Sequence, residues 1–382
     1  MTDNRYRRLP VGIQSFKVIR EENYLYVDKS DIVWNMVNLG DKYNYLSRPR
    51  RFGKSVLVDT LESYLEGRKD LFEGLKIMQL EKDWKQYPVI RLDMSRGGAN
   101  EETLRSYLNL RFKDYEEKYN ITPDPTAMLA DRFHAIIATA YKQTGLRVAV
   151  LIDEYDSPLQ HSWRTPEHEK CTGVYREVFA ILKADDEYEH FVFITGITKF
   201  TQISLFSVLN NLSNISFTPE YAAICGITEE EIEENFMPEI IQMSEANNWS
   251  VQETHDRLKA YYDGYHFSDD NMVDIYNPYS LVNALKQRKI KNFWASSGAT
   301  SLLPKFVDNA ELRISNFENI RIMRNTLELS DVSGGGAELF LYQSGYLTIK
   351  DSDEFGYILG FPNEEVKQAL YEYYGEDLTA GR

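Results

Sequence analysis

The chain has 382 residues, with 43 Lys and Arg against 59 Asp and Glu and a formal net charge of −16. This acidic balance excludes a uniformly basic surface that coats nucleic acid, so any nucleic-acid contact must be confined to a local patch. Two cysteines without a CxxC spacing and six scattered histidines exclude a disulfide framework and a Cys/His zinc site. Because the sequence shows no secretion signal and no apolar run of about 18 residues, we expect a cytoplasmic protein without a membrane partner.

The first half of the chain alternates short β-rich runs with longer stretches of helical periodicity. We expect strands over residues 43–46, 89–92, 148–152 and 191–195, a fifth strand over 215–217, and helices that include 54–66, 101–119 and 126–143. This alternation predicts an α/β fold in which helices cover both faces of a parallel sheet.

The strand signal fades after about residue 219. Residues 229–286 show helical patterns, and from about 337 the pattern is helix, β-hairpin with a polar turn at 351–353, and helix, which resembles a winged-helix module. We therefore predict three parts: an α/β domain over 1–218, a helical region over 219–305 and a winged-helix-like module over 306–382.

A Gly-Lys-Ser sequence follows the first expected strand and begins a helix. A phosphate-binding loop requires this chemistry, because amides at a helix start bind phosphate oxygens, a Lys adds a mobile charge and a hydroxyl serves Mg²⁺. Ser55 is the predicted hydroxyl ligand of the metal, and Arg48 occupies the position of the first glycine in the general motif. An ordinary strand-to-helix turn is the alternative. The predicted nucleotide-binding residues are Arg48, Pro49, Arg50, Arg51, Phe52, Gly53, Lys54, Ser55 and Val56.

Three arginines within this loop are unusual. Arg48, Arg50 and Arg51 could neutralise a triphosphate, bind a carboxylate from a neighbouring domain, or lie in a solvated turn, and these alternatives stay open.

Acids follow the most apolar of the expected strands. Asp153 and Glu154 come directly after residues 148–152. In P-loop ATPases an acid at this place holds the metal and the next one activates water, so we assign Asp153 to Mg²⁺ and Glu154 to the base. A buried strand that ends at the surface in two acids is the alternative.

The strand over 191–195 ends in Thr195, and we expect it to lie between the other two strands. Thr195 is the first candidate for a sensor of the γ-phosphate and Thr198 the second, while Lys199 is expected to be a solvated surface residue. The predicted catalytic residues are Lys54, Glu154 and Thr195.

Six segments together resemble the bacterial AAA-ATPase-like family, which is related to the STAND-type archaeal ATPases with a paired arginine in the loop. They span residues 9–16, 24–30, 48–55, 151–156, 262–265 and 276–279. The resemblance implies a P-loop NTPase three-layer sheet of the additional-strand class, a helical lid and a winged-helix-like module. It also implies that the first loop glycine is typically replaced, as by Arg48 here.

Members of this family often continue into a PD-(D/E)XK nuclease-like domain, which we do not expect in this chain. The aromatic residues between 262 and 279 are characteristic of the family. Packing in the core or between domains is favoured for them over adenine stacking.

The expected function is therefore Mg²⁺-dependent binding of ATP with slow hydrolysis, used as a molecular switch by a P-loop ATPase. Three alternatives stay open: a non-hydrolysing, nucleotide-gated interaction module, a nucleotide or small-molecule kinase, and an ATPase subunit of a DNA-processing or defence system. ATP and Mg²⁺ are the expected cofactors. A protein partner or a second copy of the chain is an open possibility, and the net charge does not indicate nucleic acid.

Overall fold

The computed structural model describes residues 8–124, 126–200, 212–297, 303–306, 317–329 and 336–380. The chain divides into two compact units. We call the one formed by Ser30–Ser47 and Val58–Ile215 the sheet unit. The second unit contains residues from the N-terminal segment up to Lys29, the stretch Arg48–Leu57 and the part of the chain from Ser216 onward. The three-part division expected at 218 and 305 stays a prediction.

The sheet unit is built on five parallel strands in the order β2-β3-β4-β1-β5. Four of them confirm the expected strands. The strands are β1 (Tyr43–Ser47), β2 (Val89–Asp93), β3 (Val148–Asp153), β4 (Glu189–Gly196) and β5 (Ser213–Asn214).

The strand expected at 215–217 is wrong. These residues form the 3₁₀ turn η5 (Ile215–Phe217), and β5 consists of the two residues before it. Among the described residues, β5 pairs with Asn44 and Tyr45 of β1. The ladder therefore ends where the chain leaves the sheet unit, and the carbonyl of Ser216 accepts a hydrogen bond from Arg48 instead (2.9 Å).

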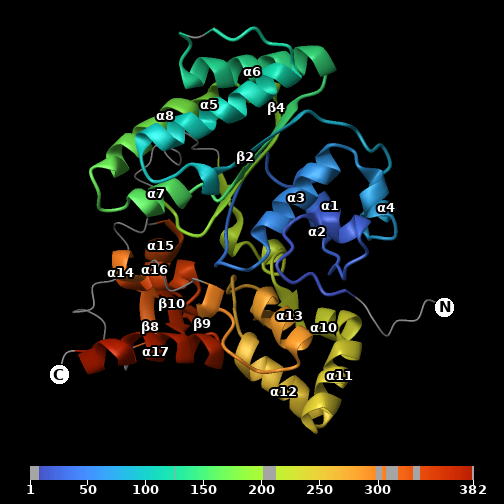
Figure 1. The fold of residues 1–382 in the computed structure, drawn as a ribbon, viewed down its shortest axis with the longest axis vertical. Coiled ribbons are helices and arrows are strands. Elements are labelled where there is room, and N and C mark those ends of the chain that lie inside the picture. The colour runs from blue at the N-terminus through green and yellow to red at the C-terminus, as the bar shows by residue number, and fades with distance from the viewer. Residues whose placement is uncertain are drawn as a thin grey trace. The chain divides into compact units, whose positions relative to one another are not determined.

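Helices lie on both faces of this sheet, which makes a three-layer α/β arrangement (Figure 1). All six residues of β3 are buried, as expected for a central strand covered on both faces. Arg91 of β2 ties one helix layer to the sheet through ion pairs with Asp59 (2.7 Å) and Glu62 (2.5 Å). The helices are α2 (Ser30–Asn38), α3 (Lys54–Leu65) and α4 (Ile77–Leu80) in one layer, α5 (Glu101–Lys118), α6 (Leu129–Thr144) and α8 (Glu167–Ala184) in the other, and the short α7 (Ser157–Ser162).

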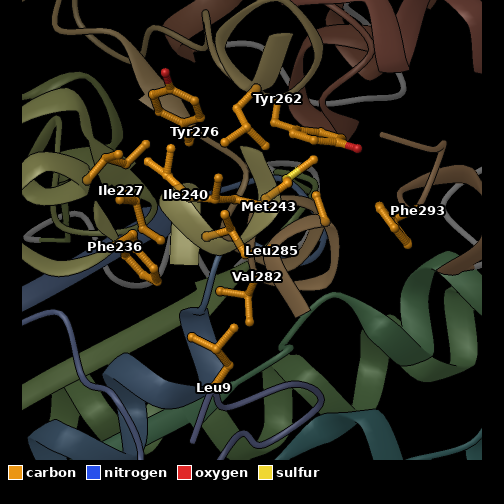
Figure 2. Close-up of a cluster of buried hydrophobic side chains, with 14 residues drawn as sticks. Leu9, Ile227, Phe236, Ile240, Met243, Tyr262, Tyr276, Val282, Leu285 and Phe293 are labelled. Atoms are coloured by element: carbon orange, nitrogen blue, oxygen red, sulfur yellow. The ribbon is translucent and has the colours of Figure 1, made fainter. Parts of the chain in front are cut away.

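The second unit contains the helical region expected after residue 219. Its helices there are α10 (Glu229–Asn235), α11 (Met237–Asn247), α12 (Val251–Tyr262) and α13 (Pro278–Gln287), and α1 (Phe16–Glu21) comes from the N-terminal segment. A short antiparallel ladder, β6 (Ile227–Thr228) with β7 (Ile275–Tyr276), was not expected from the sequence. Figure 2 shows the core of this region, where Leu9 lies beneath Val282 and joins the apolar side chains of α11, α12 and α13.

The C-terminal part of the second unit confirms the expected series of helix, β-hairpin and helix. It comprises α14 (Leu303–Phe306), β8 (Ile320–Met323), α15 (Arg324–Leu329), α16 (Gly336–Ser344), β9 (Thr348–Asp353), β10 (Gly356–Gly360) and α17 (Glu364–Ala380). β8, β10 and β9 form an antiparallel sheet in that order. The polar turn expected at 351–353 is wrong, because these residues belong to β9. The turn comes just after them, where Asp353 Oδ1 accepts from the amides of Phe355 (2.9 Å) and Gly356 (3.1 Å).

No helix within the described residues has the length and apolar character needed to cross a bilayer.

Glu231 connects two parts of the second unit that are far apart in the sequence. Its carboxylate accepts two hydrogen bonds from Lys29 Nζ (2.6 and 2.8 Å), with both side chains largely buried. The same carboxylate accepts from the amide of Thr228 (2.9 Å) and completes a capping box at the start of α10.

Replacement Glu231→Ala should lower the free energy of unfolding by about 3 kcal/mol, because it removes the carboxylate half of the capping box and leaves the buried Lys29 charge without its partner. The measurement is urea unfolding of the purified chain. The matched control Glu233→Ala changes an exposed glutamate on the same helix and should cost less than about 0.5 kcal/mol. Equal losses in the two variants would contradict the assigned role of the ion pair.

Candidate functional site

The predicted phosphate loop follows directly from β1, and its first side chain is deeply buried. Arg48 is 1% exposed. Its guanidinium donates from Nη1 to the carbonyl of Ser216 and from Nη2 to the carbonyl of Tyr221, both at 2.9 Å, and lies over the ring of Phe267 at 4.2 Å. Burial lowers the pKa of Arg48 to about 10. A solvated turn is therefore the wrong interpretation for this arginine, while its place in a nucleotide site stays a prediction.

Aromatic residues of the second unit pack against the loop. Phe52 is buried and meets Tyr265 and Phe267 edge to face, with centroid distances of 4.8 and 5.4 Å. Arg51 lies over the ring of Tyr279 at 4.8 Å. These contacts confirm packing as the role of the aromatic residues at 265 and 267, because their rings are occupied by loop side chains.

The backbone of the loop bends sharply before α3. Arg51 has φ +70° and Gly53 has φ +87°, and a Cβ placed on Gly53 would meet no atom within 4 Å. Gly53 thus combines a backbone conformation that favours glycine with open space beside its Cα. This combination fits a phosphate group that approaches the main chain closely.

Lys54 begins α3 and is 6% exposed. Its Nζ donates to the carbonyls of Arg48 and Pro49, both at 2.9 Å, so its charge lies within the loop. Ser55 and Val56 follow in the first turn of α3. All the predicted nucleotide-binding residues, 48–56, belong to the second unit.

The predicted acids lie in the sheet unit, at the end of β3. Asp153 is the last residue of this strand, 2% exposed, and its Oδ1 accepts from the amide of Glu154 (3.0 Å). Glu154 is half-buried and has φ +47°, a left-handed conformation that is uncommon outside glycine. The acids therefore stand in a tight, specific turn.

Strand β4 lies between β1 and β3, as the sequence predicts. Leu46 of β1 is in register with Thr195, and Ile152 of β3 is in register with Ile194. Since all three strands are parallel, their carboxyl ends reach the same edge of the sheet. The loop leaves β1 and the acids leave β3 at that edge.

The side chains at the end of β4 are engaged within the sheet unit. Thr195 is fully buried and its hydroxyl donates to the carbonyl of Leu46 (2.8 Å), so its role as a sensor stays a prediction. Thr198 is also buried and donates to Asp156 Oδ2 (2.7 Å). Lys199 is 7% exposed, which makes the expected solvated position wrong.

Sequence reasoning assigned no role to Tyr155 and Asp156, which the structure buries beside the acids. The sequence does show an acid, Asp156, soon after the apolar run over residues 148–152. An acid in that position is common in turns, so the sequence could not separate it from a solvated residue.

Within the described part of the chain, no three His, Cys, Asp or Glu side chains gather into a group that could hold a metal ion. A magnesium site built on the nucleotide's own oxygens needs fewer protein ligands. Ser55 and Asp153 supply the hydroxyl and carboxylate oxygens that Mg²⁺ prefers, so their chemistry fits this ion.

Comparison with known proteins identifies a family and a relative by sequence. The family model described as "Predicted AAA-ATPase" matches residues 10–206. A protein of Azotobacter chroococcum mcd 1, described as "Uncharacterized protein in vnfD 5'region", is 32% identical over 375 residues, which covers 96% of this chain and 69% of that protein.

Two solved structures are similar at a lower level. They are the Aeropyrum pernix ORC1 protein in complex with DNA (12% identity, TM-score 0.28, 97% of this chain and 95% of that one) and Cdc6p from Pyrobaculum aerophilum (12% identity, TM-score 0.28, 99% and 97%). Scores this low carry no argument about the present chain.

The contacts of Arg48 can be tested by substitution. Arg48→Met should lower the free energy of unfolding by about 2 kcal/mol, because the carbonyls of Ser216 and Tyr221 lose their donors. Arg48→Lys should not restore stability, since an ammonium can neither bridge two carbonyls in a fixed fork nor stack on Phe267 in the same way. Arg50→Met, at a half-buried position of the same loop, is the control. Full stability of Arg48→Lys in chemical denaturation would refute the bridging role.

Proposed function

Because the chain belongs to the AAA-ATPase-like family, we propose that its nucleotide-binding, ATPase-type function consists of binding Mg²⁺-ATP at residues 48–56 and hydrolysing it slowly as a molecular switch. Asp153 and Glu154 would act on the same nucleotide.

One observation carries this proposal: the order of strands in the sheet unit. β4 separates β1 from β3, so the chain continues into the loop and into the acid turn from the same edge of one sheet. Ligands of open α/β sheets bind outside the carboxyl ends of the strands. If residues 48–56 were an ordinary strand-to-helix turn, nothing would require β3, two places away in the sheet, to end in the buried Asp153 and the half-buried Glu154.

The loop residues would bind the phosphates. Gly53 lets the main chain approach an oxyanion, and the start of the 12-residue helix α3 is an anion-binding end by its dipole. Lys54 would have to exchange the carbonyls of Arg48 and Pro49 for phosphate oxygens, which adds a local rearrangement to binding. Bound Mg²⁺ would supply neutralisation of phosphate charge, with Ser55 and Asp153 as its protein ligands.

Glu154 would act as the general base. Its carboxylate accepts a proton from water while the water oxygen bonds to the γ-phosphorus, and the bond from that phosphorus to the bridging oxygen breaks. The products are ADP and inorganic phosphate. The half-buried position of Glu154 at the sheet edge supports this role, because a base must be reachable by water.

The contacts between the loop and the rest of the second unit support the proposed role as a molecular switch. Arg48 and Phe52 contact Ser216, Tyr221, Tyr265 and Phe267, so a change in the loop's conformation must alter packing over this stretch of the second unit. If this packing has a second arrangement, binding of a ligand to the loop would shift the balance between the two and so reach other parts of the second unit.

Substitutions should separate binding from turnover. Lys54→Ala should raise the dissociation constant for ATP at least about 10-fold, because it removes the charge assigned to the phosphates. Glu154→Gln should retain binding and lose about 100- to 1,000-fold in kcat, because an amide cannot accept the proton. The assays are fluorescent-nucleotide titration and phosphate release, with Glu187→Gln, an exposed position, as the control. Equal turnover in wild type and Glu154→Gln would remove Glu154 from the mechanism.

The nucleotide and metal requirements give a second test. ATP should bind more tightly than GTP, and EDTA should abolish turnover while weakening ATP binding, since Ser55 and Asp153 would then have no ion to hold. Titrations of both nucleotides with and without Mg²⁺ measure this directly. ATP binding without release of phosphate would favour a nucleotide-gated interaction module, and transfer of phosphate to an added hydroxyl acceptor would favour a kinase.

A further inference from the structure

A single buried carboxylate oxygen organises the turn that carries Glu154. Asp156 is 1% exposed, and its Oδ2 accepts four hydrogen bonds. The donors are the amides of Ile197 (3.0 Å) and Thr198 (2.6 Å), the hydroxyl of Thr198 (2.7 Å) and the side-chain amide of Gln160 (2.5 Å). Three of these four donors belong to the segment after β4, so Asp156 joins the acid turn to that segment within the sheet unit.

Tyr155 reinforces the same connection from the neighbouring position. Its amide donates to the carbonyl of Thr195 (3.0 Å), and its buried hydroxyl donates to the carbonyl of Thr198 (2.9 Å) and accepts from the amide of Phe200 (2.9 Å). The turn is therefore attached to residues 195–200 by both main-chain and side-chain hydrogen bonds.

Glu154 needs this support because its backbone is strained. A left-handed conformation at a non-glycine residue, φ +47° here, costs about 1 kcal/mol or more and persists only where surrounding contacts impose it. Two hydrogen bonds of the Glu154 main chain are local: its amide donates to Asp153 Oδ1 and its carbonyl accepts from the amide of Ser157, both at 3.0 Å. After Glu154, Tyr155 and Asp156 bind the end of β4 and the segment that follows it.

The residue that faces Asp156 at the end of β4 must also be small. A Cβ on Gly196 would fall well inside van der Waals contact with Asp156 Oδ1 and would lie 2.8 Å from Tyr155 Cδ1. Glycine at the end of β4 is therefore the residue that allows the carboxylate to approach the main chain of Ile197 and Thr198.

From this network we infer that Asp156 is a positioning residue for Glu154: it holds the base in its strained conformation and makes that conformation depend on residues 197–200. The inference rests on the proposed ATPase function. Asp156 needs its negative charge for this role, because four donors converge on one oxygen and charge-assisted hydrogen bonds are about twice as strong as neutral ones. Its side chain is enclosed by protein donors, so it is not itself a base.

The test compares Asp156→Asn with Thr198→Ser and Thr198→Val in the full chain. Asp156→Asn should lower kcat for ATP hydrolysis about 100-fold, because a base displaced by about 1 Å loses this much, while the dissociation constant for ATP stays within about 2-fold. Thr198→Ser keeps the hydroxyl donor and should retain more turnover than Thr198→Val, which should fall about 10-fold. Gly196→Ala displaces the carboxylate without removing it and should reproduce the loss in kcat.

Hydrogen exchange of the nucleotide-free chain gives a readout independent of turnover. The amides of Ile197 and Thr198 should exchange faster in Asp156→Asn than in wild type, because their acceptor is weakened. Faster exchange together with the selective loss in kcat supports the inference.

Loss of turnover in Glu154→Gln with full turnover in Asp156→Asn overturns the positioning role alone. An equal loss of ATP affinity and kcat in Asp156→Asn also overturns it, because a residue that acts only through Glu154 leaves binding intact. Equal turnover in wild type and Glu154→Gln overturns the proposed base, and the positioning role with it. That result is recognised without any variant of Asp156.

Discussion

Strand β4 is hydrogen-bonded along both edges, to β1 and to β3, and this double pairing decides where the functional segments leave the sheet. A parallel ladder cannot slip by one residue without turning every buried side chain to the other face. With Leu46 opposite Thr195 and Ile152 opposite Ile194, the segments that follow β1 and β3 leave the sheet at the same edge. The chemistry proposed for this protein depends on that register before any side chain is considered.

The loop over residues 48–56 and the acid turn are stabilised by different kinds of contact. The loop depends on the buried Arg48, which donates hydrogen bonds to two carbonyls. It also depends on the edge-to-face packing of Phe52 against Tyr265 and Phe267. The acid turn depends on hydrogen bonds to the end of β4 within the sheet unit, centred on Asp156. Apolar packing tolerates small shifts, whereas a fourfold hydrogen-bonded carboxylate does not. In the function proposed above, the loop would change with its ligand and Glu154 would be held in place.

Each expectation that failed comes from the local sequence pattern, which does not show how residues pair or how deeply they are buried. The strand at 215–217 was inferred from apolar residues, but strand formation also needs a partner edge, and within the described part of the chain β5 pairs with Asn44 and Tyr45. The turn at 351–353 was inferred from polarity, but polar residues are tolerated in β9, where Lys350 and Asp351 are exposed. Lys199 was expected at the surface because lysine usually is, and only its position after β4 buries it.

Local sequence patterns predict four of the five strands of the sheet, the order of the motifs along the chain and the family, because apolar periodicity and short motifs are local properties. Apolar runs at 43–46, 89–92, 148–152 and 191–195 all became strands, and Gly53-Lys54 stands at a helix start as the motif requires. Only the tertiary structure decided that Arg48 binds carbonyls, that Phe52 rests on Tyr265 and Phe267, and that Asp156 binds the segment after β4. Each of these contacts joins residues separated by 40 or more positions, and no local pattern encodes such a pairing.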